Sequence, residues 1–208
     1  TPIQALGVSD ERHAGEMPEP GEVLATIREA GAAGDLTGLY AAGPQLRATR
    51  NSAGTRHAYA SERFFLDYSL YTVDTRGENK AVKDLHAGRQ WQAEALASRI
   101  EASQRQLGAL AGASRELAPG DYRAYLAPAA VDALVAMFSW GAVSYGASRR
   151  GDSALSRLIE GTAALSPLFT LRENFALGLC PRFNGLGEMA PLTLNMGYAV
   201  PAYECWLA

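Results

Sequence analysis

The sequence contains few of the residues that build metal and disulfide sites. Only two cysteines and three histidines occur among its 208 residues. Two isolated cysteines are too few for a disulfide framework or a zinc cluster, and neither Cys180 nor Cys205 has the nearby basic group and histidine that would activate a thiolate. We therefore expect both to be small buried apolar side chains. His13, His57 and His86 are scattered without metal-ligand spacing, and packing within a strand is favoured over ligation for His57.

Recognised catalytic motifs are also absent from the sequence. It has no HExxH, HExxxH or CxxC motif, no Gly-x-Ser-x-Gly elbow, no Walker loop and no GxGxxG loop. The segment GLGE at residues 185–188 is interpreted as a turn rather than a phosphate-binding loop, because no helical pattern follows it. Acidic residues are plentiful, but no pair stands out by its spacing. Residue chemistry alone thus supports no catalytic residue, and an enzyme would have to use residues outside these motifs.

Long hydrophobic runs and a basic charge excess are missing as well. No apolar run approaches the ~20 residues of a membrane-spanning helix, and the first residues lack the basic start and apolar stretch of a signal peptide. The net charge of −3 argues against a general nucleic-acid binder, which normally carries a basic stripe. We expect a cytoplasmic globular protein with no membrane partner and no direct nucleic-acid partner.

The patterns that are present predict an α+β fold of antiparallel or mixed sheets with two kinds of helix. Residues 39–50 and 55–73 flank the turn sequence NSAG and predict a strand–turn–strand. The segment at 22–34 predicts a short surface helix that ends at glycine. Residues 88–111 predict a long amphipathic helix. Alternate residues of the second strand predict a packed core face, namely Phe64, Leu66, Tyr68, Leu70 and Thr72.

Residues 130–146, AVDALVAMFSWGAVSYG, predict a different kind of helix. They are apolar on almost every side, so we expect this helix to be buried inside the domain or against another subunit, with Trp140 in a core. Before it, residues 119–128 predict a loop and a short strand.

The C-terminal part predicts further short elements. Residues 152–161 predict a helix capped by Asp152 and ended by Gly161. Residues 167–178 and 192–200 predict strands, with turns at 184–185 and 195–197. We divide the chain into an N-terminal α+β domain, residues 1–118, and a second domain, residues 119–208. The apolar end YAVPAYECWLA and the start without methionine favour a piece of a longer protein, in which the second domain is incomplete.

The order of several stretches resembles the TldD/PmbA family, once called modulators of DNA gyrase and regarded as metalloprotease-associated proteins. The resemblance runs from about Leu36 to the end of the chain and more weakly before it. It rests on these stretches in this order: RATRNSAGTRHAYASERFFLDYSLYT, DLHAGRQWQAEALASRI, PGDYRAYLAPAAVDALV, SALSRLIEGTAALSPLFTLREN and RFNGLGEMAPLTLNMG. Family members are longer than this chain, which agrees with an incomplete second domain.

The resemblance implies a role without catalysis. In the TldD branch, the helix after the Pro-Gly-x-Tyr strand carries HExxxH, which binds zinc and supplies the general base. The matching helix here, residues 130–146, contains no histidine and no glutamate. The likeness therefore points to the PmbA (TldE) branch, a non-catalytic subunit that pairs with a TldD-like zinc-bearing subunit. It implies unfolded or small peptides as substrates, and zinc in the partner but no cofactor in this chain.

Alternatives to this hypothesis remain. The chain could instead be a stand-alone peptide- or protein-binding module, alone or as a homo-oligomer, or an enzyme that uses residues outside known motifs. Ser153, Arg157 and Arg172 lie in family-like stretches and are candidates for binding substrate or partner. The competing interpretations are helix capping for Ser153 and solvated surface for both arginines. No residue is assigned a catalytic or metal-binding role.

Overall fold

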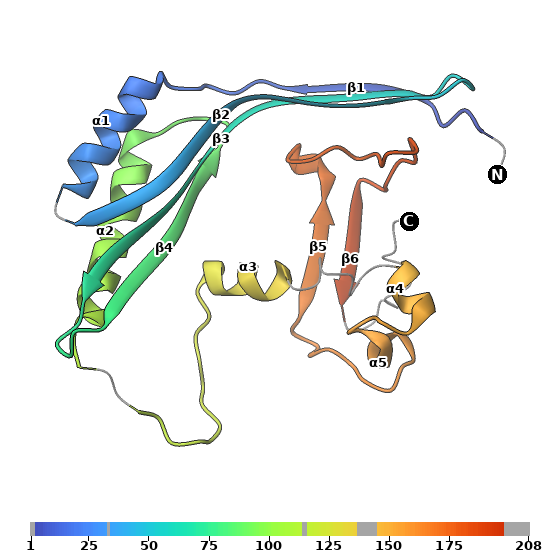
Figure 1. Ribbon diagram of the computed structural model, residues 1–208. Helices are drawn as coiled ribbons and strands as arrows, with labels where there is room; N and C mark the ends of the chain where they lie inside the picture. The colour runs from blue at the N-terminus through green and yellow to red at the C-terminus, as the bar shows by residue number, and fades with distance from the viewer. Residues whose placement is uncertain (1–2, 33, 114–115, 137–144, 198–208) are drawn as a thin grey trace. The chain divides into compact units, whose positions relative to one another are not determined.

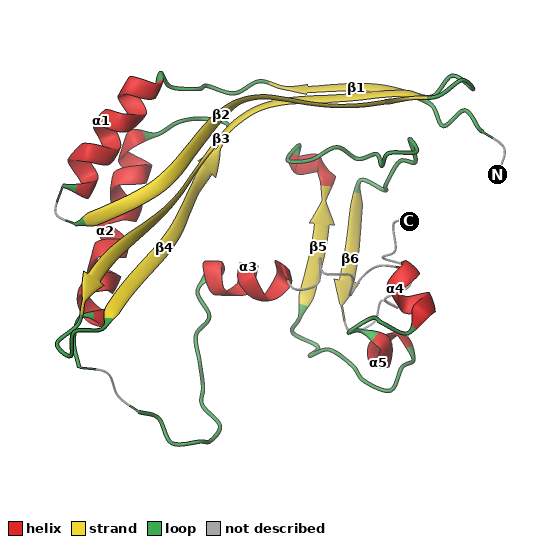
Figure 2. Ribbon diagram, in the orientation of Figure 1, coloured by secondary structure: helices red, strands yellow, loops and turns green. Residues whose placement is uncertain are grey.

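The computed structural model describes residues 3–32, 34–113, 116–136 and 145–197. Within these ranges the chain forms two sheets and five α-helices, so the predicted α+β class is confirmed (Figure 1, Figure 2). The chain divides into two compact units. The first, called here the sheet unit, comprises Asp10–Arg47 and Tyr59–Tyr122. The second, called the tip unit, comprises Thr1–Ser9, Ala48–Ala58 and Arg123–Ala208. The domain division at residue 118 stays a prediction.

The larger sheet is organised around one long strand. Its strands are β1 (Val8–His13), β2 (Asp35–Arg50), β3 (Arg56–Val73) and β4 (Asn79–Gly88). The order is β1-β3-β2, and β4 also pairs with β3. Strands β3 and β4 are antiparallel, from Phe64 opposite Gly88 to Val73 opposite Asn79. The predicted strand–turn–strand is thus confirmed, whereas β1 and β4 were not predicted.

Two helices cover one face of the sheet unit. Helix α1 (Pro20–Gly31) packs against α2 (Ala93–Leu110), and α2 packs against β4. The predicted amphipathic helix is confirmed over α2, although Trp91 precedes its first turn. Because successive strand residues face opposite sides, alternate residues of β3 meet the buried stripe of α2. This core contains Leu66, Tyr68, Leu70, Val82, Leu96, Ile100 and Leu107.

Among the described residues, one turn geometry occurs three times, at Asn51–Thr55, Asp74–Glu78 and Asn184–Glu188. In each, the first residue donates its N–H to the carbonyl of the fifth, at 3.2, 2.9 and 3.1 Å. The side-chain Oδ1 of the first residue accepts hydrogen bonds from the N–H groups two and four positions later. The fourth residue is a glycine with φ of 101°, 82° and 86° respectively. The pattern Asx-x-x-Gly therefore specifies a turn whose glycine supplies the left-handed backbone.

The tip unit contains short elements. They are α3 (Pro128–Ala136), α4 (Tyr145–Arg150), α5 (Ser156–Ile159), β5 (Thr170–Asn174), a 3₁₀ turn (Phe175–Leu177) and β6 (Thr193–Gly197). Strands β5 and β6 pair antiparallel, from Thr170 opposite Gly197 to Asn174 opposite Thr193. The two predicted C-terminal strands are confirmed over these shorter ranges, while residues 198–200 of the second prediction lie outside the described residues.

Three local predictions for this part of the chain are wrong. Residues 121–127 form no strand. Residues 195–197 lie in β6 and do not form a turn. The helix predicted over 152–161 is limited to α5, and Leu155 rather than Asp152 stands at its N-cap. Helix α5 starts later than predicted because Ser153 forms a separate turn, in which its Oγ accepts the N–H of Leu155 at 3.1 Å.

Helix α3 also departs from its predicted environment. None of its described side chains is buried, and Val131 and Leu134 are 43% and 47% exposed. Burial by the described part of the chain is therefore wrong for these residues, while burial against another subunit stays a prediction. A helix that is apolar all round needs cover on several sides, which residues 128–136 do not receive within the described chain. Residues 137–144, including Trp140, lie outside the described residues.

Candidate functional site

Ser153 lies in the turn that precedes α5 and is 5% exposed. Its Oγ accepts the N–H of Leu155, and its carbonyl accepts the N–H of Ser156 at 3.1 Å. Both bonds belong to the turn that precedes α5, whose N-cap is Leu155, so helix capping by Ser153 is not confirmed. A role for Ser153 in binding stays a prediction.

The two candidate arginines lie on different elements of the tip unit. Arg157 is exposed on α5, and its carbonyl accepts the N–H groups of Thr162 and Ala163 at 2.9 and 3.0 Å. Arg172 is exposed on β5, opposite Asn195 of β6. Binding of substrate or partner by Arg157 and Arg172 remains a prediction.

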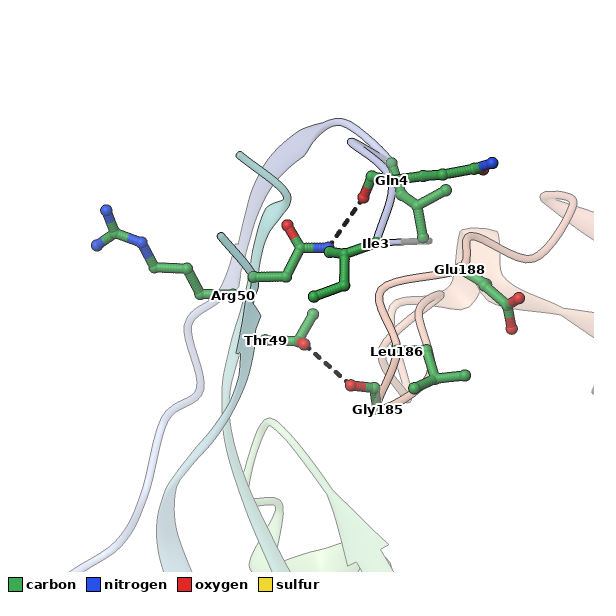
Figure 3. A pocket seen from close by; sticks show the side chains of 9 residues that line it. Ile3, Gln4, Thr49, Arg50, Gly185, Leu186 and Glu188 are labelled. Carbon is green, nitrogen blue, oxygen red and sulfur yellow. Dashed lines mark hydrogen bonds between the residues drawn. The ribbon is translucent and has the colours of Figure 1, made fainter. Parts of the chain in front are cut away.

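A cavity of about 390 Å³ lies within the tip unit (Figure 3). Three chain segments form its wall: the N-terminal segment, the end of the β2–β3 hairpin and the turn before β6. The lining residues are Ile3, Gln4, Leu6, Thr49, Arg50, Asn51, Gly185, Leu186 and Glu188.

Hydrogen bonds hold these segments together. The Thr49 hydroxyl donates to the carbonyl of Gly185 at 3.1 Å, and the Asn51 side-chain amide donates to the carbonyl of Gln4 at 2.9 Å (Figure 3). The Thr55 hydroxyl accepts the N–H of Leu6 at 2.7 Å. The polar side chains of the hairpin turn are thus used to position the wall of the cavity.

Gly187 lies where the turn at Asn184–Glu188 comes close to the turn at Asn51–Thr55. A Cβ atom there would lie 2.6 Å from Cγ2 of Thr55, a distance that real Cβ atoms do not adopt. Its φ of +86° is also a conformation that favours glycine. Glycine is therefore required at residue 187 by both the backbone and the neighbouring turn.

The wall of the cavity combines apolar and polar side chains. Ile3, Leu6 and Leu186 supply apolar surface. The Glu188 carboxylate accepts a hydrogen bond from the Asn184 side chain at 2.6 Å, and the Arg50 guanidinium points away from the cavity (Figure 3). The cavity is therefore an apolar hollow edged by polar groups.

His57 packs beside the turn at Asn184–Glu188. It is 2% exposed, its Nδ1 lies 2.7 Å from the Ser9 hydroxyl, and its ring stacks on Phe183 with 5.4 Å between centroids. His86 belongs to the sheet unit, where it contacts the rings of Phe64 and Trp91. Burial lowers the pKa of His86, so its imidazole is neutral at physiological pH.

Metal-binding residues do not gather in the described part of the chain. Within those ranges, His, Cys, Asp and Glu form no group of three that could hold a metal ion. Cys180 is exposed, so its predicted burial is wrong, and Cys205 lies outside the described residues. Across the described residues, every helix is too short or too polar to span a bilayer.

The comparisons with known proteins return nothing: no protein-family model, curated protein or solved structure matches the chain. The TldD/PmbA resemblance therefore remains a prediction. Sequence reasoning also missed the cavity. The turns at Asn51 and Asn184 were visible as turn signals, but nothing in the sequence indicates that they meet.

Proposed function

We propose that this chain is a non-catalytic subunit of a TldD/TldE-type zinc metalloprotease complex that acts on unfolded or small peptides in the cytoplasm. One observation carries the proposal: family-like stretches occur in the family's order, while residues 130–146 contain no histidine or glutamate where the zinc motif would stand. A zinc ligand must be an imidazole, thiolate or carboxylate, and Asp132 is the single such residue in this segment.

The exposed apolar helix α3 supports a partner. Val131 and Leu134 expose nearly half of their side-chain surface, and such surface is stabilised when another protein covers it. In the proposed complex this helix lies against the TldD-like zinc-bearing subunit.

The proposed division of labour leaves peptide cleavage to the partner. Zinc held there would polarise the peptide carbonyl and activate a water molecule. This chain would bind and orient the peptide, with an apolar peptide side chain in the cavity beside Leu186. Arg157 and Arg172 would pair with peptide or partner carboxylates, and Ser153 would maintain the turn before α5 or contact the partner.

Native mass spectrometry of the protein from its own source tests the proposal. The expected species contains this chain, a second family member and one zinc ion per pair. A metal-free monomer or homo-oligomer, with no second family member in any preparation, would overturn it.

The cavity favours a second candidate, a stand-alone peptide- or protein-binding module. Its lining residues all belong to one unit of this chain, so peptide binding there needs no other subunit. Peptide binding by the isolated chain, without hydrolysis, would favour this module. Hydrolysis that survives a chelator would favour an enzyme with residues outside known motifs.

A further inference from the structure

Strand β2 has one open edge in the sheet unit. It pairs with β3 on one side, and no other strand of the described residues pairs with it. The part of β2 within the sheet unit is residues 35–47. An edge of this length presents a row of backbone N–H and C=O groups that another strand can satisfy.

This edge lacks most of the usual protection against pairing. Residues 36–46, LTGLYAAGPQL, contain no charged side chain. Leu39 and Leu46 are 63% and 71% exposed. Edge strands are normally short or carry charges that prevent association. Pro44 is the exception, because it removes one N–H donor.

The two charges that border this segment are arranged symmetrically. Asp35 and Arg47 lie at equal sequence distances on either side of Ala41. Neither takes part in an ion pair within the described residues. Opposite charges facing each other across two strands are stabilising, and like charges are destabilising.

We propose that a second copy of this chain pairs with the open edge of β2, antiparallel and centred on Ala41. In this register Asp35 of each copy faces Arg47 of the other. Two further pairs match in character, since Leu36 faces Leu46 and Thr37 faces Gln45. Gly38 faces Pro44, so the proline ring meets no side chain. A parallel arrangement would place Asp35 beside Asp35 and is disfavoured.

The inference goes beyond the proposed function. The edge involves neither the cavity nor α3, and pairing of two copies through it requires no zinc-bearing subunit. An extended peptide or an unrelated chain could also satisfy an open edge, and the experiment separates these occupants from a second copy.

Site-directed cross-linking of the protein tests the register. Ala41→Cys is prepared with Cys180→Ser and Cys205→Ser, and a short bis-maleimide is added. In the proposed register, residue 41 of one copy faces residue 41 of the other copy across the twofold axis. The reagent is therefore expected to link the two copies covalently. Ala81→Cys in the same background is the control, because Ala81 is exposed on β4 away from this edge. Equal dimer yields from the two variants, or cross-links to other proteins alone, would overturn the proposal.

Charge exchange gives an independent readout by sedimentation equilibrium. Asp35→Lys is expected to weaken dimerisation about five-fold, because two like-charged pairs replace two opposite-charged pairs. Adding Arg47→Glu should restore the dissociation constant. A monomer at every concentration, or a double variant no better than Asp35→Lys, would reject this register. Neither result changes the expected zinc content of a complex with a TldD-like subunit, so the two proposals fail separately.

Discussion

Helices α2 and α3 are both rich in apolar residues, but only α2 has a buried face. Leu96 and Ile100 of α2 are 0% exposed, whereas α3 has no buried side chain in its described residues. In α2 the apolar residues form one stripe, which a single sheet can cover. In α3 they surround the helix, and no one surface covers them all. The distribution of apolar residues around a helix therefore decides whether the rest of its own domain can cover all of them.

The same contrast holds for the two units. Large side chains such as Phe64, Leu66 and Tyr68 fill the sheet unit. The buried apolar residues described in the tip unit are Ala147, Phe175 and Ala190, while Leu168 is 95% exposed. Among the described residues, large buried apolar side chains are therefore concentrated in the sheet unit.

The largest expected effect separates the two helices directly. Leu96→Ala should lower the free energy of unfolding by about 2–5 kcal/mol, because it removes a fully buried side chain. Leu134→Ala, the matched change in α3, should cost less than about 1 kcal/mol, since Leu134 is half exposed. Urea unfolding measures both. Equal losses would show that α3 is as well packed as α2.

A second pair of variants tests close packing in the tip unit. Gly187→Ala should destabilise it by about 2–4 kcal/mol, through backbone strain and the clash with Thr55. Gly54→Ala occupies the same place in its turn, with φ of +101°, but has open space around it and should cost about 1–2 kcal/mol. Hydrogen exchange at the Leu6 amide, which bonds to the Thr55 hydroxyl, measures the loss of stability in the tip unit. An equal effect at both glycines would exclude the contact as its cause.

A smaller effect is expected from one hydroxyl in the sheet unit. The Tyr68 hydroxyl lies 3.2 Å from Ser103 Oγ and donates to Asp84 at 3.4 Å, and burial raises the pKa of Tyr68. Tyr68→Phe should cost about 1–2 kcal/mol, because Ser103 loses a buried partner. Tyr71→Phe is the exposed control and should change stability by less than about 0.5 kcal/mol. Thermal unfolding that shifts equally in both variants would contradict a role for this hydrogen bond.

The smallest effect concerns acid sensitivity of the Asp74 turn. The N–H groups of Glu78 and Arg76, together with Lys80, hold the pKa of Asp74 below its ordinary value. A carboxylate with a lowered pKa stabilises the fold above its unfolded pKa of about 4, and this contribution is lost as the pH falls through the folded value. Asp74→Asn keeps the Asx turn, as Asn51 and Asn184 show, but cannot titrate.

Stability of the wild type and Asp74→Asn should therefore converge as the pH falls below about 4. Urea unfolding between neutral and acidic pH measures the difference. A constant difference over this range would mean that Asp74 does not stabilise the sheet unit as a charged group.

Local structure followed from sequence patterns over most of the sheet unit. The alternation in β3 and the stripe of α2 predicted their buried faces, and the sequences NSAG and Asn184-Gly185 predicted two turns. Strand β4 was missed because Asp84 and His86 occupy its inward-facing positions, where a strand pattern would show apolar residues. The helix start at Asp152 failed because a local turn at Ser153 competes with capping.

The candidate cavity could not be predicted, since its wall joins residues 3–6, 49–51 and 185–188, which are far apart in sequence. The sequence by itself determined the amphipathic helix, the alternating strand and the Asx turns. Their hydrogen bonds and the spacing of their apolar residues depend on near neighbours in the chain. Tertiary structure alone decided that Gly187 meets Thr55, that α3 stays exposed and that β2 keeps an open edge. Burial and pairing depend on which distant surface reaches a segment, and no local pattern contains that information.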